Sequence, residues 1–294
     1  MAGTITRRRF DPFLRDPEHP VKPTRLGATI ILAVLVVLSL AAFIPLYWMF
    51  ATSLTPATMT VKMPPELIPS NPTLDNYRAV LAQPNFMRWV INSLIQAGSI
   101  TLVTVVTASM AGYALAKLPF RGSRLLFWLF ILSMMLPFEA ILVPLFLVVT
   151  RLGLVDTYLG LLLPLMVAPF GIFLMKQFIG TLPSELLDAA RVDGASEPRI
   201  LWEVVLPLVR PGMAFLGIIT FVGQWNAFVW PLIVTRSSQM RTLQVGLVLL
   251  REQEPLFYGL QMAAAVLAAV PVIVIFFAFQ RYFLRGVTVG ALKG

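Results

Sequence analysis

Long apolar stretches alternate with short polar connections along most of this chain. An α-helix rises 1.5 Å per residue, so about 20 apolar residues are needed to cross about 30 Å of hydrocarbon. Each of the main stretches is long enough. The pattern therefore predicts an all-α, polytopic membrane protein whose six transmembrane helices cover residues 26–50, 89–116, 125–150, 157–176, 210–235 and 256–281.

The polar ends of the chain complete the predicted division into regions. Residues 1–25 contain several prolines that disfavour a regular helix, and we interpret them as an N-terminal arm. A secretory signal is the alternative, but its apolar core spans about 7–15 residues, and the stretch 26–50 is longer. We therefore expect a retained first span, a membrane domain over residues 26–285 and a tail over residues 286–294.

Lysine and arginine are unevenly divided between the connections. If the amino terminus lies inside, the inner connections hold 16 of these residues and the outer connections hold 7. Cytoplasmic connections carry the excess of positive charge in membrane proteins. The bias predicts that both termini and the polar segment 183–207 lie in the cytoplasm, and that the protein is a multi-pass component of the cytoplasmic (inner) membrane.

Composition supports the membrane class and removes other classes. Charged residues make up 13% of the chain, whereas soluble domains average about 25%. The net charge of +9 would suggest nucleic-acid binding in a soluble protein, but here the charges lie between apolar stretches, and no nucleic-acid partner is expected. The chain has no cysteine, which excludes disulfides and thiolate metal sites.

The 183–207 segment is the best-formed polar interruption of the apolar pattern, and it predicts two helices joined by a sharp turn. Ser184 is a candidate N-cap, Gly194 can take the left-handed conformation that ends a helix, and Ser196 can cap the next helix. Asp188 and Arg191 are expected to form an i,i+3 pair that contributes about 0.2–0.5 kcal/mol.

The first of these helices is expected to be two-sided. Glu185, Asp188 and Arg191 cluster on one side. The other side is apolar and consists of Leu186, Leu187, Ala189 and Ala190. A passive amphipathic helix on the membrane surface is the alternative interpretation, but this polar side is more acidic than basic, which does not suit anionic lipid.

The spacing in the segment resembles the EAA motif of bacterial ABC-importer permeases. That motif reads EAA, three residues, Gly, nine residues, Ile, one residue and Leu-Pro. The chain keeps every spacing, with Asp188 where Glu is usual and Val204 where Ile is usual. The matching residues are Asp188, Ala189, Ala190, Gly194, Val204, Leu206 and Pro207.

The resemblance covers nearly the whole chain. Residues 44–47 end the first span as in these subunits, and Asn76-Tyr77 fits their outer loop. Trp225-Asn226, followed by Pro231-Leu232, is similar to the fifth span of sugar permeases. Residues 286–294 are similar to the end of maltose-type (MalG-like) subunits, so the chain resembles the carbohydrate branch of the binding-protein-dependent transport family.

The resemblance implies a division of labour among several chains. A coupling helix would dock in a cleft of the ATP-binding subunit. The residues implied in this coupling are Glu185, Asp188, Ala189, Ala190, Asp193, Gly194, Leu206 and Pro207. The implied partners are a homologous second permease subunit in a heterodimer, two ATP-binding subunits, an extracytoplasmic substrate-binding protein and the lipid membrane.

The cargo implied by the resemblance is a sugar, an oligosaccharide or a related polyol phosphate. ATP and Mg would be used by the partner ATPase, with no cofactor bound by this chain. The sequence contains no GxxxxGK[ST] phosphate-binding loop, so a non-catalytic transport subunit is expected rather than an enzyme.

Polar residues inside the predicted spans are candidates for the substrate path. Glu139 lies in the middle of a predicted span, where acids are costly and often functional, although a structural hydrogen bond is the alternative. Gln224, Trp225 and Asn226 combine amide and aromatic groups that suit sugar hydroxyls and ring faces. Polar side chains also join membrane helices. We interpret a second set in this way, namely Asn92, Gln96 and Ser99.

The outer connection 236–254 is polar and long enough to contact the binding protein, although a passive connector is the alternative. The candidate residues are Arg241, Arg251, Glu252 and Glu254. A self-sufficient secondary transporter or channel for a small polar solute remains the alternative function. It predicts an inverted repeat and several buried ionisable residues, and neither is evident in the sequence.

Overall fold

The computed structural model describes residues 25–56, 68–253 and 257–291. The chain divides into two compact units, residues 1–48 and 49–294. Most of α1 (Arg25–Ser53) belongs to the first unit, and its last turn belongs to the second. The predicted N-terminal arm lies outside the described residues, except for its last residue, Arg25.

The regular secondary structure of the described residues is all helical, as predicted, and contains no strand. Three helices are long and apolar enough to cross a membrane: Leu26–Ser53 within α1, α3 (Phe86–Lys117) and Tyr258–Phe279 within α14 (Tyr258–Ala291). Up to six spans result if each of three bent helix pairs counts as one. The predicted number of spans is therefore an upper limit for the described residues, and half of those spans are not single straight helices.

The predicted span 125–150 is the most strongly bent. It consists of α4 (Ser123–Met134) and α5 (Phe138–Arg151), whose axes differ by 101°. Pro137 stands at the break with an extended backbone (φ −64°, ψ 140°). Proline has no N–H for the helix ladder and disfavours helical geometry in the residue before it. The prediction of one continuous helix is therefore wrong here, because apolar length alone does not register the proline.

The next predicted span is also broken. Residues 157–176 form α6 (Tyr158–Leu162), a short 3₁₀ turn (Leu163–Leu165) and α7 (Pro169–Gly180), and the two parts are bent by 44°. Proline occurs in the turn and again at the start of α7. The bend has the same cause as the break before α5.

The predicted span 210–235 is divided as well. It contains α11 (Arg210–Trp225) and α12 (Val229–Val234), separated by residues 226–228. The run Glu197–Leu208 meets α11 at an angle of 80°. This run is made of α9 (Glu197–Arg199), a π-helical turn (Ile200–Val205) and α10 (Leu206–Leu208).

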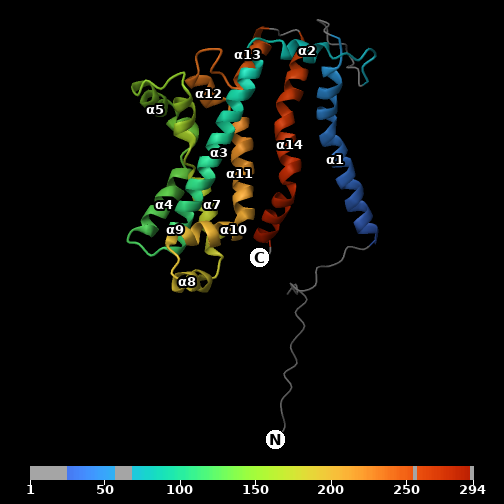
Figure 1. Cartoon of the computed structure of the whole chain (residues 1–294). Coiled ribbons are helices and arrows are strands. Elements are labelled where there is room, and N and C mark those ends of the chain that lie inside the picture. Colours follow the sequence, from blue (N-terminus) through green and yellow to red (C-terminus); the bar gives the residue numbers. More distant parts are fainter. Residues whose placement is uncertain (1–24, 57–67, 254–256, 292–294) are drawn as a thin grey trace. The chain divides into compact units, whose positions relative to one another are not determined.

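Helix α3 is the central element of the second unit and packs against α7 and α11, while α11 also packs against α14 (Figure 1). At Gly112 the backbone of α3 comes close to that of α7. A Cβ atom placed on it would lie 2.8 Å from the backbone nitrogen of Lys176. Small residues at a crossing let two membrane helices approach closely.

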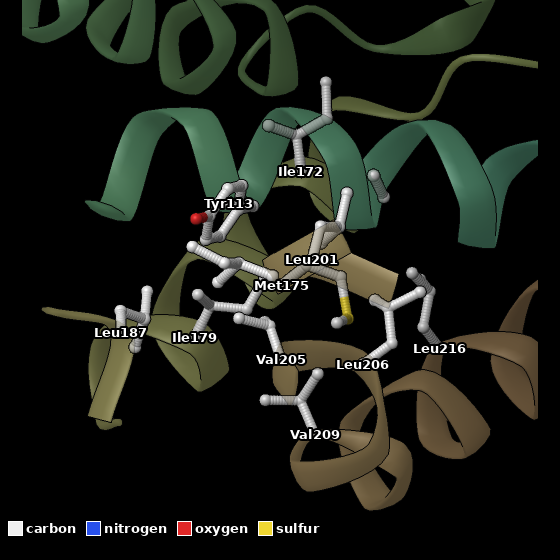
Figure 2. Close-up of a cluster of buried hydrophobic side chains, with 12 residues drawn as sticks. Tyr113, Ile172, Met175, Ile179, Leu187, Leu201, Val205, Leu206, Val209 and Leu216 are labelled. Carbon is white, nitrogen blue, oxygen red and sulfur yellow. The ribbon is translucent and has the colours of Figure 1, made fainter. Parts of the chain in front are cut away.

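Three shorter helices lie at the two ends of α3. At its Phe86 end are α2 (Asp75–Leu81) and α13 (Leu243–Gln253). At its Lys117 end is α8 (Ser184–Val192), which stands apart from the packed helices (Figure 1). Buried apolar side chains join α8 to the body, as Figure 2 shows for Leu187, Ile179 and Met175.

Candidate functional site

The 183–207 segment forms the predicted helix, turn and helix. Gly194 has φ +80° at the turn. Its N–H donates to the carbonyl of Arg191 at 3.0 Å, and the N–H of Ala195 donates to the carbonyl of Ala190, also at 3.0 Å. This pair of bonds is a Schellman motif, in which a left-handed residue ends the helix. The predicted left-handed conformation of Gly194 is confirmed.

The predicted caps are wrong in detail. Pro183 occupies the N-cap of α8, and Ser184 is the first helical residue, so its hydroxyl is not in the capping position. Ser196 does occupy the N-cap of α9, but its side chain makes no capping hydrogen bond. Proline has a fixed φ and no N–H, and an extended Pro183 (φ −58°, ψ 133°) can begin the helix without a side-chain cap.

Helix α8 is anchored by one side chain and exposes most of the others. Leu187 is buried with 1% of its surface exposed, and Ala190 packs partly against the same core. Leu186 is 43% exposed and Ala189 is exposed, so the expected apolar side is only partly covered. Val192, near the end of the helix, is 87% exposed. The remaining candidates on this surface are also exposed and are Glu185, Asp188, Ala189, Asp193 and Gly194.

A chain of polar contacts crosses the turn. Arg191 donates from Nη1 to Oδ1 of Asp188 at 2.7 Å, which confirms the expected pair. It also donates from Nε to Oε1 of Glu197 at 2.7 Å and from Nη2 to Oε2 at 3.4 Å. The hydroxyl of Tyr113 in α3 donates to Oε2 of the same glutamate. Residues before the turn, after the turn and in α3 are thereby connected.

This network shifts the pKa values of its members. The hydrogen bonds from Arg191 and then Tyr113 hold the pKa of the Glu197 carboxyl below its usual value, against the smaller opposing effect of burial. Bonds to Glu197 and Asp188 raise the pKa of Arg191. The ion pairs therefore persist at neutral pH.

Two further contacts fix the ends of the segment. Lys117, the last residue of α3, donates from Nζ to the carbonyl of Leu182 at 2.6 Å, just before α8. Leu206 at the other end is 8% exposed and belongs to the buried core. Pro207 follows it in α10, directly after the π-helical turn. Because Pro207 cannot donate to a carbonyl one turn earlier, it is placed where the helix ladder is already irregular.

A pocket of about 280 Å³ lies near the other end of the second unit. It brings together Glu139 and Gln224, two residues selected from the sequence. The other lining residues are mainly apolar or aromatic and are Phe138, Leu165, Ala227, Phe228, Val229 and Trp230. No basic side chain is among them.

The break before α5 determines the position of Glu139. This residue lies in the first turn of α5 rather than in the middle of a continuous helix. The first turn of a helix favours a carboxylate, because the backbone N–H groups there are unpaired. Gln224 is held from the α3 side, since Nε2 of Gln96 donates to its Oε1 at 3.2 Å.

Trp225 and Asn226 are not in the pocket lining. Trp225 is 1% exposed, donates its indole N–H to the carbonyl of Ala268 at 3.0 Å and stacks on Phe221. Asn226 donates to the carbonyl of Val222 at 3.0 Å. Trp225 thus joins α11 to α14, which is the structural role that polar groups have between membrane helices.

The connection 236–254 is largely structured. Its second half is α13, on which Arg251 and Glu252 are exposed. Arg241 is half-buried, and Asn92 in α3 donates to its carbonyl at 2.8 Å, in agreement with the joining role expected for Asn92. Glu254 lies outside the described residues.

Asp156 is a residue that the sequence patterns did not indicate. It is non-glycine with φ +60°, and its carboxylate accepts the backbone N–H groups of Arg236 at 2.8 Å and Ser237 at 3.0 Å. Burial would raise the pKa of Asp156, but these hydrogen bonds together outweigh it and lower the pKa. The sequence does contain one indication of this turn. Asp156 directly precedes Thr157, which caps α6, and Asp is one of the few residues that tolerate positive φ.

The described residues form apolar helical spans, with a pocket near one end and a helix–turn–helix at the other. These features define a polytopic membrane transport protein. The family described as "binding-protein-dependent transport system inner membrane component" matches residues 104–289. The chain belongs to this family and is a permease subunit of a binding-protein-dependent importer.

Similar proteins agree with this assignment. The chain is 38% identical over 256 residues to the arabinooligosaccharides transport system permease protein AraQ of Halalkalibacterium halodurans, covering 86% of this chain and 92% of that protein. It is 34% identical to the sn-glycerol-3-phosphate transport system permease protein UgpE of Yersinia enterocolitica, covering 89% and 96%. A solved bacterial ABC transporter involved in alginate import has the same fold, with a TM-score of 0.78 at 24% identity over 88% of this chain and 97% of that chain.

Proposed function

We propose that this chain forms half of the translocation path for a sugar, oligosaccharide or related polyol phosphate in an ATP-driven importer. The observation that carries the proposal is the 183–207 segment. Its first helix stands outside the packed helices, exposes acidic and apolar side chains, and is joined to α3 by hydrogen bonds through Glu197. The relatives named for arabinooligosaccharide and glycerol phosphate transport support this class of cargo.

The proposed assembly contains a homologous second permease subunit, two ATP-binding subunits and an extracytoplasmic substrate-binding protein. ATP and Mg act in the ATP-binding subunits, and this chain is non-catalytic. We infer that α8 docks on an ATP-binding subunit in the cytoplasm, since the excess of lysine and arginine favours that side. The candidate contacts for the binding protein, Arg241, Arg251 and Glu252, lie on or near α13, at the other end of α3.

Glu139 and Gln224 are proposed to face the substrate during passage. A carboxylate accepts hydrogen bonds from sugar hydroxyls, an amide can donate to them, and aromatic side chains can pack on ring faces. The absence of a basic group from the lining favours a neutral, hydroxyl-rich cargo over an anionic one.

The decisive experiment is reconstitution of the complete complex in proteoliposomes. Uptake of labelled arabinooligosaccharides and of glycerol 3-phosphate would be measured with and without internal ATP and with and without the binding protein. ATP-dependent and binding-protein-dependent accumulation of one of them is the expected result. Accumulation by the purified chain alone, driven by an ion gradient, would instead establish a secondary transporter.

A further inference from the structure

A small number of side chains connect α8 to α3. Leu187 supplies the fully buried apolar contact of α8. Its polar counterpart is the group Arg191, Glu197 and Tyr113, which we name the turn clamp. Tyr113 lies on α3, is 3% exposed and packs in the buried apolar cluster. The clamp therefore ends on a side chain that is fixed by packing.

The turn itself is not locked by packing. A Cβ atom placed on Gly194 would meet nothing within 4 Å. The two Schellman hydrogen bonds fix the local backbone, but they involve only residues 190–195 and do not reach α3. The clamp, in contrast, joins Arg191 before the turn to Glu197 after it and to Tyr113 across the interface.

Glu197 is the shared member of the clamp. Its Oε1 accepts from Arg191, and its Oε2 accepts from both Arg191 and Tyr113. Bidentate contact with a guanidinium fixes direction as well as distance. The Glu197 carboxylate therefore restrains the angle of α8 relative to α3 on the turn side, while Lys117 holds the start of the segment through the carbonyl of Leu182.

We propose that Glu197 is the positioning residue that makes α8 and α3 move as one body, so that displacement of α8 by an ATP-binding subunit reaches the substrate path. This inference rests on the proposed function. The continuation on α3 is Gln96, whose amide contacts Gln224 in the pocket lining. Glu197 acts through Arg191 and Tyr113 and touches neither substrate nor nucleotide.

The same segment contains a matched control. Glu203 accepts from Nε of Arg199 at 2.8 Å as an exposed i,i+4 pair. This pair lies within one continuous helical run and joins no separate elements. Glu197→Gln and Glu203→Gln thus remove equal charge by the same chemical change, and only the first weakens the clamp.

The first test measures position directly. The chain has no cysteine, so Val192→Cys in α8 and Met110→Cys in α3 can carry two spin labels in the permease pair. Both residues are exposed. Electron–electron distances should be narrowly distributed in the parent and in Glu203→Gln, and clearly broadened in Glu197→Gln and Tyr113→Phe. An unchanged distribution in Glu197→Gln would overturn the proposal, whether or not the complex transports sugar.

The second test measures coupling in the assembled importer. Substrate transported per ATP hydrolysed should fall by about fivefold or more in Glu197→Gln, the lower end of typical coupling effects, and remain at the parental value in Glu203→Gln. A parental ratio in Glu197→Gln, or an equal loss in Glu203→Gln, would refute the positioning role. Failure of the parent complex to transport would refute the proposed function and leave the distance test to decide the clamp.

Discussion

Gln96 in α3 donates from Nε2 to Oε1 of Gln224 in α11 at 3.2 Å, and Gln224 in turn lines the pocket that contains Glu139. Gln96 is fully buried, so this contact is fixed between two packed helices. It connects the central helix of the body to the pocket lining, whose only carboxylate is Glu139. Gln224 and Glu139, from separate parts of the sequence, thereby share one pocket lining.

Glu139→Gln tests whether the carboxylate acts on the cargo. The substitution keeps the shape and removes the charge, so uptake should fall by about tenfold if Glu139 accepts hydrogen bonds from substrate, equivalent to about 1.4 kcal/mol. Initial uptake rates in proteoliposomes are the measurement. Glu203→Gln, an exposed position in the π-helical turn away from the lining, controls for loss of a carboxylate. Parental uptake in Glu139→Gln would indicate a structural role instead.

Gly194→Val tests the left-handed turn. Nothing obstructs a side chain there, so the cost comes only from the positive φ, which a β-branched residue resists. The variant should insert and assemble, yet its ATP hydrolysis should be uncoupled from transport. Gly180→Val is the control, because Gly180 is equally open and has no positive φ. Transport per ATP equal to that of the parent would contradict the role assigned to this turn.

Gly112→Ala tests the close crossing of α3 and α7. The added methyl group would meet the backbone of Lys176 at 2.8 Å and Met175 at 2.9 Å, and rigid backbone cannot move aside cheaply. Such overpacking costs about 1–3 kcal/mol, and the midpoint of thermal unfolding in detergent should fall accordingly. Gly98→Ala in the same helix has open space and should leave the midpoint unchanged or higher. A parental midpoint for Gly112→Ala would show that the crossing can relax.

Local patterns predicted local features well. Apolar length found the helical membrane segments, and Gly194 was identified because few residues other than glycine accept its backbone conformation. The Asp188–Arg191 pair followed from helix spacing. Pro137 was visible in the sequence, but counting apolar residues gave it no weight against a continuous span.

Contacts between distant segments could not be predicted in this way. Tyr113 and Glu197 are 84 positions apart, and neither is unusual in its own surroundings. Trp225 next to Asn226 fits a sugar site by residue type, yet its indole is directed to Ala268 in α14. Residue chemistry indicates what a side chain can do, while packing between helices decides which neighbour it meets.

The turn clamp should respond to acid in a predictable direction. The pKa of Glu197 is lower in the folded protein than its usual value of about 4.3, so its stabilising contribution is complete above that value and is lost as the pH falls through the lowered pKa. The distance distribution between labels on Val192→Cys and Met110→Cys should therefore stay narrow at neutral pH and broaden reversibly only when the pH falls below the usual pKa of a glutamate. In Glu197→Gln the distribution should already be broad at neutral pH and change little on acidification. A parent whose distribution broadened near pH 6 instead would indicate that another group controls the angle of α8.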